Sequence, residues 1–132
     1  MQRLHPAAVV DPGAKLADDV IVGPFTYLGP GVELGPGVVV GNHVSVIGAT
    51  TVGARTAIHP FAAIGGDPQD KKYRGEPTSL VIGADCRIHE GVTIHRGTPQ
   101  GGATTRVGDG FVGAFAAARL QRGDLEIAAG RD

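Results

Sequence analysis

The side chains of this sequence that are best suited to chemistry are concentrated in one stretch, IGGDPQDKKYRGEPT, at positions 64–78. Its charged members are Asp67, Asp70, Lys71, Lys72, Arg74 and Glu76. Carboxylates accept and ammonium or guanidinium groups donate the hydrogen bonds that hold polar ligands. From the residues alone, the simplest interpretation of the stretch is a charged loop in contact with water.

Histidine is the commonest general acid or base, so the five histidines are the next candidates. Four of them directly follow an aliphatic residue: His5, His59, His89 and His95. At that position a side chain is expected to face outward or to lie at a turn, and for His5 and His59 we expect surface residues without a catalytic role. His43, in the sequence GNH, is interpreted as a turn residue, and Cys86 as a small residue with no neighbouring base in the sequence.

The elements that must position these residues follow a period of six. From Leu4 to Ile64 an aliphatic residue occupies every sixth position, and a small or β-branched residue stands four positions after each one from Leu4 to Ile58. Helices do not repeat every six residues and simple strands repeat every two, whereas short strands stacked into a parallel β-solenoid do have this period. Glycine often follows the aliphatic residue, and we expect it there because it permits turn conformations that a Cβ atom obstructs.

The stretch 64–78 interrupts this period. The aliphatic positions resume at Ile82, Ile88 and Ile94, and then at Val107. Asp70 and Glu76 fall in phase between Ile64 and Ile82, but an apolar core excludes unpaired charges. We therefore predict a loop that projects from the solenoid at about residues 66–80. The step from Ile94 to Val107 is not a multiple of six, which predicts a second loop at about residues 96–106.

Composition excludes several other classes of protein. The net charge of −1 provides no basic field for nucleic acid or an anionic membrane. No apolar run is long enough for a transmembrane helix, and the first residues lack the apolar core of a secretory signal. A single cysteine cannot form an internal disulfide, which is typical of the cytoplasm. The 22 glycines and 9 prolines follow the repeat, so we interpret them as parts of an ordered fold.

Three segments together carry a family resemblance: GDPQDKKYRGEPT, IHEGVTIHRGT and QGG. Over about residues 4–110 the chain resembles the family of acyl-[acyl-carrier-protein]–UDP-N-acetylglucosamine O-acyltransferases, in its N-terminal part only. The resemblance implies an all-β fold, a left-handed parallel β-helix of about five coils with two projecting loops, assembled as a homotrimer in the cytoplasm. It also implies transfer of a 3-hydroxyacyl chain from acyl carrier protein to the 3-hydroxyl of UDP-N-acetylglucosamine, the first step of lipid A biosynthesis, with the thioester as co-substrate, no further cofactor and no metal.

Carried over residue by residue, the resemblance places Gln69, Asp70 and Lys72 in contact with substrate. Asp70 would accept hydrogen bonds from the sugar or uridine, and Lys72 would lie near phosphate or acyl carbonyl oxygens. His95, in IHRGT, would lie near the cleft between subunits. The loop would then reach toward a neighbouring subunit.

The sequence departs from the family pattern after residue 112. The family continues with a coil that carries its catalytic histidines, in the pattern His-x-Ala-His-Asp-Cys. Here Ala118 and Gln121 occupy the two histidine positions, Arg122 occupies the aspartate position, and no histidine follows His95. We therefore expect a β-helix over residues 1–112 and an aberrant, irregular or helical Ala-rich tail over residues 113–132, with no catalytic base and without the family's C-terminal helical domain. A frameshift or small deletion near codon 112 would produce this pattern.

Three functions remain open from the sequence. The first is an acyltransferase by descent that is inactive alone, because glutamine at position 121 cannot act as a general base. The second is a non-catalytic β-helix fragment that binds nucleotide-sugar or joins trimers. The third is another hexapeptide-repeat acyltransferase, against which the QDKKYRGEPT sequence argues.

Overall fold

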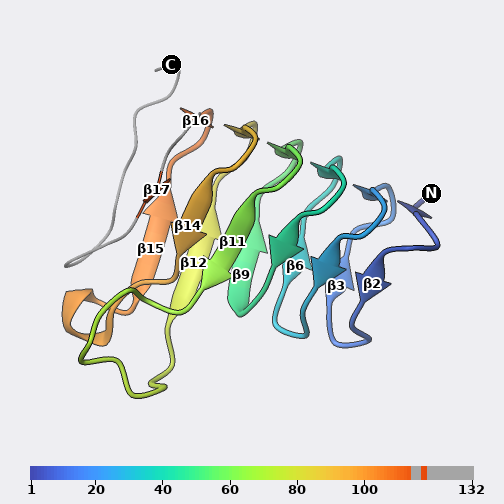
Figure 1. The fold of residues 1–132 in the computed structure, drawn as a ribbon. Helices are drawn as coiled ribbons and strands as arrows, with labels where there is room; N and C mark the ends of the chain where they lie inside the picture. Colours follow the sequence, from blue (N-terminus) through green and yellow to red (C-terminus); the bar gives the residue numbers. More distant parts are fainter. Residues whose placement is uncertain (114–116, 119–132) are drawn as a thin grey trace.

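The chain folds as a parallel β-helix, a solenoid in which the backbone passes through three sheets in turn (Figure 1). The computed structural model describes residues 1–113 and 117–118. Within these residues each strand pairs in parallel with the strand three places along the chain. This arrangement confirms the all-β solenoid that the period of six predicted.

Each face of the solenoid is one sheet of short strands. The first sheet contains β1 (Arg3–Leu4), β4 (Ile21–Val22), β7 (Val39–Val40), β10 (Ala57–Ile58), β13 (Arg87–Ile88) and β16 (Val112–Gly113). The second contains β2 (Val9–Val10), β5 (Tyr27–Leu28), β8 (Ser45–Val46), β11 (Ala63–Gly66), β14 (Thr93–His95) and β17 (Ala117–Ala118). The third contains β3 (Lys15–Leu16), β6 (Glu33–Leu34), β9 (Ala49–Val52), β12 (Ser79–Ile82) and β15 (Thr104–Val107). One strand from each sheet makes a coil, so β1–β3 form coil 1 and β13–β15 form coil 5.

The core is a narrow column inside the solenoid. In each repeat two side chains point inward, the aliphatic residue and the small residue two positions before it, as Val38 and Val40 do in coil 3. In-register pairing stacks each aliphatic residue on its equivalent in the next coil, for example Val40 on Ile58 and Ile58 on Ile88. Stacking of like residues in consecutive coils fills the interior continuously, because every coil has the same width.

The glycine that follows the inward aliphatic residue has a different role from the one predicted in most coils, with Gly65 as an exception. The left-handed backbone conformation occurs two residues later, at positions such as Phe25, Arg55 and Asp85, where φ is close to +60°. A Cβ atom on Gly23 would lie 2.7 Å from the carbonyl carbon of Gly41 in the next coil. At Gly23 and Gly53 glycine is therefore required by the close approach of stacked backbones, whereas Gly65, at the same position of the repeat before loop 1, has the positive φ of +87° that a turn role implies.

Both predicted loops are present, and both are shorter than predicted. Loop 1 comprises residues 67–78, because Gly66 belongs to β11, and Ser79 and the fully buried Leu80 belong to β12. Loop 2 comprises residues 96–103 and contains the short 3₁₀ helix η1 (Pro99–Gly101), because β15 begins at Thr104. Pairing of β12 with both β9 and β15 extends these strands to four residues, which the period of the aliphatic residues did not reveal.

The irregular or helical tail predicted over residues 113–132 is described only in part by the structure. Gly113, assigned above to the tail, pairs with Ile88, and β17 pairs with β14, so the solenoid extends beyond residue 112. Residues 114–116 and 119–132, which include Gln121 and Arg122, lie outside the described residues. In the part of the chain that the structure describes, no helix has the length and apolarity needed to span a bilayer.

Candidate functional site

The two loops project from the same corner of the solenoid, in adjacent coils (Figure 1). Loop 1 connects β11 to β12 in coil 4, and loop 2 connects β14 to β15 in coil 5. Backbone hydrogen bonds join their bases, from Gly97 N to Ser79 O at 3.1 Å and from Ser79 N to Ala103 O at 2.8 Å. The rigid sheets therefore hold two irregular, polar segments next to one another.

Arg96 is the side chain that connects the two loops. It is 9% exposed, and its guanidinium donates to Asp67 Oδ1 at 2.6 Å, to Gly65 O at 2.5 Å and to Thr78 Oγ1 at 3.1 Å. One planar group therefore binds the first and last residues of loop 1 and the strand that precedes the loop. The guanidinium also donates a longer hydrogen bond, of 3.3 Å, to Tyr73 Oη. Five N–H donors in a fixed fork make arginine suited to this role.

The guanidinium of Arg96 remains protonated despite its burial. Burial alone would lower the pKa of Arg96, but hydrogen bonds with Asp67 and Tyr73 outweigh it and raise that pKa. The base of loop 1 therefore carries a permanent positive charge, opposite a carboxylate whose side chain is 74% exposed.

His95 lies beside Arg96 at the same base. Its Nδ1 is 2.8 Å from Asp67 O. Because a carbonyl oxygen only accepts, Nδ1 must carry the proton of this hydrogen bond. The neutral ring then has its lone pair on Nε2, which can accept a hydrogen bond from a ligand hydroxyl. A shift in register between β11 and β14, where Gly66 pairs with His95, places the ring there.

The other three predicted site residues lie further out on loop 1. Asp70 Oδ1 accepts from Lys72 N at 2.9 Å, and Asp70 O accepts from Tyr73 N at 3.0 Å, so this carboxylate closes a tight turn. Gln69 and Lys72 are exposed. Among the described contacts, no hydrogen bond or ion pair joins any of these three residues to His95. The structure therefore brings His95 to the base of the loop, leaves Gln69 and Lys72 exposed, and holds the half-buried Asp70 by its carboxylate at the backbone of Lys72.

A second turn stiffens the far side of loop 1. Arg74 N donates to Glu76 Oε1 at 2.7 Å, and this hydrogen bond lowers the pKa of Glu76. Tyr73 Oη donates to Glu76 O at 2.9 Å. The loop is thus held by its own polar groups, and it can present ligand-binding side chains in a defined arrangement.

The remaining candidates occupy surface or core positions. His5 is exposed, and His43 lies at a turn with φ of +54°, its ring between those of Phe25 and Phe61 at centroid distances of 5.1 and 5.2 Å. Cys86 is 1% exposed, and burial raises the pKa of its thiol. These placements agree with the interpretation of His43 as a turn residue and of Cys86 as a small interior residue.

Sequence reasoning missed Arg96, Asp67 and Tyr73 as the residues that hold the site together. Arg96 stands two positions after the inward Ile94, where an outward side chain is expected. The available signal was its place in IHRGT, which was used only for His95. Its burial depends on loop 1 folding over it from another coil, and no local pattern encodes that.

A family model, curated relatives and solved structures all relate this chain to hexapeptide-repeat transferases. Residues 13–48 match the model of the bacterial transferase hexapeptide (six repeats). An acyl-[acyl-carrier-protein]–UDP-N-acetylglucosamine O-acyltransferase from Saccharophagus degradans is 52% identical over 109 residues, which are 83% of this chain and 42% of that protein. The corresponding protein of Azorhizobium caulinodans is 53% identical over 106 residues, 80% of this chain and 39% of that one.

The solved structure of the UDP-N-acetylglucosamine O-acyltransferase from Moraxella catarrhalis superimposes with a TM-score of 0.83 at 39% identity, covering 90% of this chain and 46% of that chain. The chain belongs to the UDP-N-acetylglucosamine O-acyltransferase family. Its fold is the left-handed parallel β-helix that the resemblance implied. It spans less than half the length of these acyltransferase relatives.

A more distant likeness shows the fold alone. A GDP-perosamine N-acetyltransferase from Caulobacter crescentus superimposes with a TM-score of 0.54 at 24% identity.

Proposed function

We propose that this chain is the nucleotide-sugar-binding part of an acyltransferase of this family, which moves a 3-hydroxyacyl chain from acyl carrier protein to the 3-hydroxyl of UDP-N-acetylglucosamine in the cytoplasm. The observation that carries the proposal is the pair of loops fixed to each other by Arg96. His95, at the end of β14, lies at the base of the loops, and loop 1 carries the exposed Gln69 and Lys72 and the half-buried Asp70.

Each residue has a role that its chemistry allows. The carboxylate of Asp70 accepts hydrogen bonds from sugar or uridine groups, with one oxygen also holding the turn at Lys72 N. The exposed ammonium of Lys72 neutralises phosphate, and the amide of Gln69 donates and accepts. His95 offers Nε2 as an acceptor.

The exposure of Gln69 and Lys72 leaves both side chains accessible to a second copy of the chain, which would complete the site. The surface also supports self-association, because large apolar side chains are exposed on coils 1 to 4. These are Val9 (60% exposed), Phe25 (62%), Tyr27 (40%), Val39 (42%) and Phe61 (63%). Phe25, Tyr27 and Phe61 line a shallow hollow of about 340 Å³. Exposed apolar side chains of this size favour burial between subunits, and a homotrimer is the proposed assembly.

Catalysis by this chain alone is expected to be weak. The family's base position falls on Gln121, and an amide cannot take up a proton from the sugar hydroxyl. Loss of a general base typically lowers the rate by about 10²–10⁴-fold. We therefore propose binding of nucleotide-sugar as the principal activity of these residues, with acyl transfer strongly reduced.

The test is calorimetric titration of the purified chain with UDP-N-acetylglucosamine. Asp70→Asn retains an oxygen acceptor for the turn and removes the charge, and Lys72→Ala removes the ammonium. We expect each variant to bind at least about tenfold more weakly, because charge-assisted hydrogen bonds to ligands contribute about 1.5–3 kcal/mol. Asp18→Asn and Lys71→Ala, both at exposed positions, are the matched controls and should bind as the unchanged chain does.

Three outcomes would contradict the proposal or a part of it. Equal affinity of Asp70→Asn, Lys72→Ala and the controls would remove loop 1 from the site. Absence of binding to any uridine nucleotide, with binding of another sugar nucleotide or acyl donor, would favour a different hexapeptide-repeat transferase. Acyl transfer at the ordinary rate of the family would show that another group replaces the base.

A further inference from the structure

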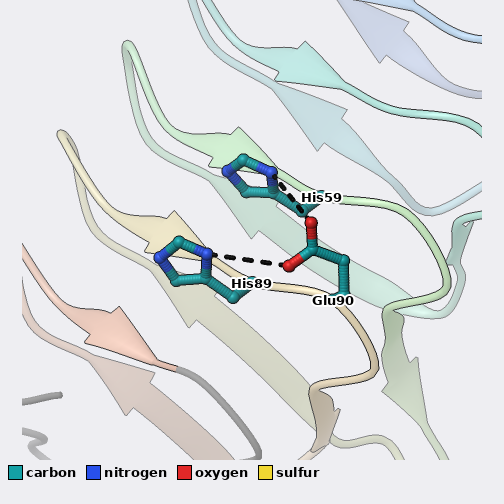
Figure 2. A group of neighbouring side chains, drawn as sticks. All are labelled: His59, His89 and Glu90. Atoms are coloured by element: carbon teal, nitrogen blue, oxygen red, sulfur yellow. Dashed lines mark ion pairs between the residues drawn. The ribbon is translucent and has the colours of Figure 1, made fainter.

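Two histidines and a glutamate form a cluster on the first sheet, on a different face from the start of the two loops. His59 follows β10 and His89 follows β13, and their imidazole rings are stacked with centroids 4.8 Å apart and planes 15° from parallel. Figure 2 shows both rings turned with one nitrogen toward the carboxylate of Glu90. His59 Nδ1 lies 3.8 Å from Glu90 Oε2, and His89 Nδ1 lies 3.8 Å from Glu90 Oε1.

The β-helix creates this cluster from residues that are distant in the sequence. Ile58 pairs with Ile88, so the residues that follow them occupy equivalent positions in coils 4 and 5. His59 N donates to Ile88 O at 2.8 Å and continues the parallel ladder, which holds the two backbones in register. The cluster therefore joins the same two coils that carry loop 1 and loop 2.

The donor set suits a divalent transition metal. Imidazole nitrogens and one carboxylate oxygen are typical ligands of Zn²⁺, and three protein ligands leave a fourth position for water or another group. The candidate ligand atoms all lie within 4.8 Å of one another. Bonds of about 2.0–2.2 Å at tetrahedral angles place ligand atoms about 3.4 Å apart, so the cluster must contract on binding.

The exposure of the three side chains permits that contraction. The side chains are 37% (His59), 34% (His89) and 62% (Glu90) exposed. The nearly parallel rings cannot both direct a lone pair at one ion, so each must turn about its Cβ–Cγ bond. Each ring is about one-third exposed and, among the described residues, makes no hydrogen bond that this turn would break. A bound ion would also replace two long histidine–carboxylate contacts by short bonds.

We propose that His59, His89 and Glu90 form a divalent metal site for a zinc-like ion, which links coils 4 and 5. The residues alone did not suggest this site, because His59 was expected to have no role and no metal was expected. The inference does not depend on the proposed acyltransferase function. The ion would fix the spacing of the two coils that carry the loops.

The first experiment is calorimetric titration of the metal-free chain with Zn²⁺. The repeat provides a matched control in the histidine of coil 1. His5 follows β1 and occupies the same position of the repeat in coil 1, so His5→Ala removes an equivalent surface histidine outside the cluster. We expect one Zn²⁺ per chain for the unchanged protein and for His5→Ala. His59→Ala, His89→Ala and Glu90→Gln should each weaken binding by at least about tenfold.

A second readout separates a built site from scattered surface binding. Co²⁺ bound by nitrogen and oxygen in a tetrahedral site absorbs visible light more strongly than hydrated Co²⁺. We expect this absorption in the unchanged chain and in His5→Ala, and its loss in His59→Ala/His89→Ala. Circular dichroism of the double variant checks the fold, which should persist because both side chains lie outside the core.

The proposal would be overturned by either of two results. One is Zn²⁺ binding of equal affinity in the unchanged chain and the folded double variant. The other is the absence of saturable Zn²⁺ binding by the unchanged chain at micromolar concentration. An increase of the thermal midpoint on adding Zn²⁺, present in His5→Ala and absent in the double variant, would support it independently.

Discussion

The guanidinium of Arg96 donates to the carboxylate of Asp67 at 2.6 Å, which binds the start of loop 2 to the start of loop 1. The two residues belong to successive coils and meet because β14 lies next to β11. Asp67 is largely exposed and Arg96 is buried, so the pair lies where the loops leave the core. The pair therefore ties the base of loop 1 to the neighbouring coil.

We expect Arg96→Ala to release loop 1 and to destabilise the chain by about 3 kcal/mol. The variant loses a buried, charge-assisted hydrogen bond and leaves Gly65 O without its partner. Hydrogen exchange of residues 67–78 should increase, together with a lower midpoint in urea. Arg74→Ala is the matched control, since its side chain is exposed and, among the described residues, donates hydrogen bonds only to nearby backbone carbonyls. Equal exchange in the two variants would show that Arg96 does not hold the loop.

Gly65 should not tolerate a side chain. Its φ is +87°, and a Cβ atom there would overlap Ile47 O and Thr50 Oγ1. Gly91 has a similar φ of +75°, with nothing within 4 Å of the added atom. Gly91→Ala therefore measures the conformational cost alone, about 1–2 kcal/mol. Gly65→Ala adds the overlap and should cost at least about 3 kcal/mol by chemical denaturation. Similar costs for both variants would contradict the predicted close packing beneath loop 1.

Thr105 offers a stabilising substitution. It is fully buried, and its Oγ1 has no hydrogen-bond partner among the described residues. We expect Thr105→Val to raise the free energy of unfolding by about 1 kcal/mol, because it removes an unsatisfied polar group at nearly constant volume. Thr50 occupies the equivalent position of coil 3, but its Oγ1 donates to Ile47 O at 2.7 Å. Thr50→Val should therefore destabilise by about 1 kcal/mol. The same sign for both variants would refute the prediction.

Cys86 should react slowly in the folded chain and should affect stability at alkaline pH. Burial raises the pKa of its thiol above the ordinary 9.0, so the folded state favours the protonated form. The unfolded chain loses this proton first, so the resulting stabilisation is present below pH 9 and decreases as the pH rises above it. Alkylation at pH 8 should be at least about tenfold slower than in urea. In Cys86→Ala the part of the decrease in unfolding free energy above pH 9 that is due to this thiol should disappear. An identical dependence of unfolding free energy on pH in the variant and the unchanged chain would contradict this prediction.

How much of the molecule the sequence could predict depended on the range of the interactions involved. Leu28, Val40 and Ile58 all occupy the aliphatic position of the six-residue repeat, and all three are buried. The burial of each could therefore be predicted from the sequence. The charge at the in-phase position Asp70 and the break in phase before Val107 likewise predicted both loops. The ends of the loops were misplaced because Leu80 and Thr105 extend strands by pairing with neighbouring coils.

The site shows the same division. Loop 1 and its polar side chains were visible as a departure from the period, and its family motif indicated Gln69, Asp70, Lys72 and His95. Neither the motif nor the period indicated that Asp70 holds its own turn, or that the proton of His95 lies on the nitrogen facing Asp67. Those details depend on backbone groups brought close by the turn and by the neighbouring coil.

The sequence by itself determined the period, the inward residues and the existence of two loops, because each repeat buries its aliphatic residue for the same local reason. Only the tertiary structure decided which residues from different coils meet. Stacking of coils in register places Arg96 against Asp67 and His59 against His89, although about thirty residues separate each pair along the chain. All of loop 1 beyond its first residue lies between the two members of each pair. The length of loop 1 therefore determines which residue of coil 4 lies next to each residue of coil 5. A solenoid converts spacing along the chain into contacts between coils, so the chemistry of its surface is fixed by register and not by local pattern.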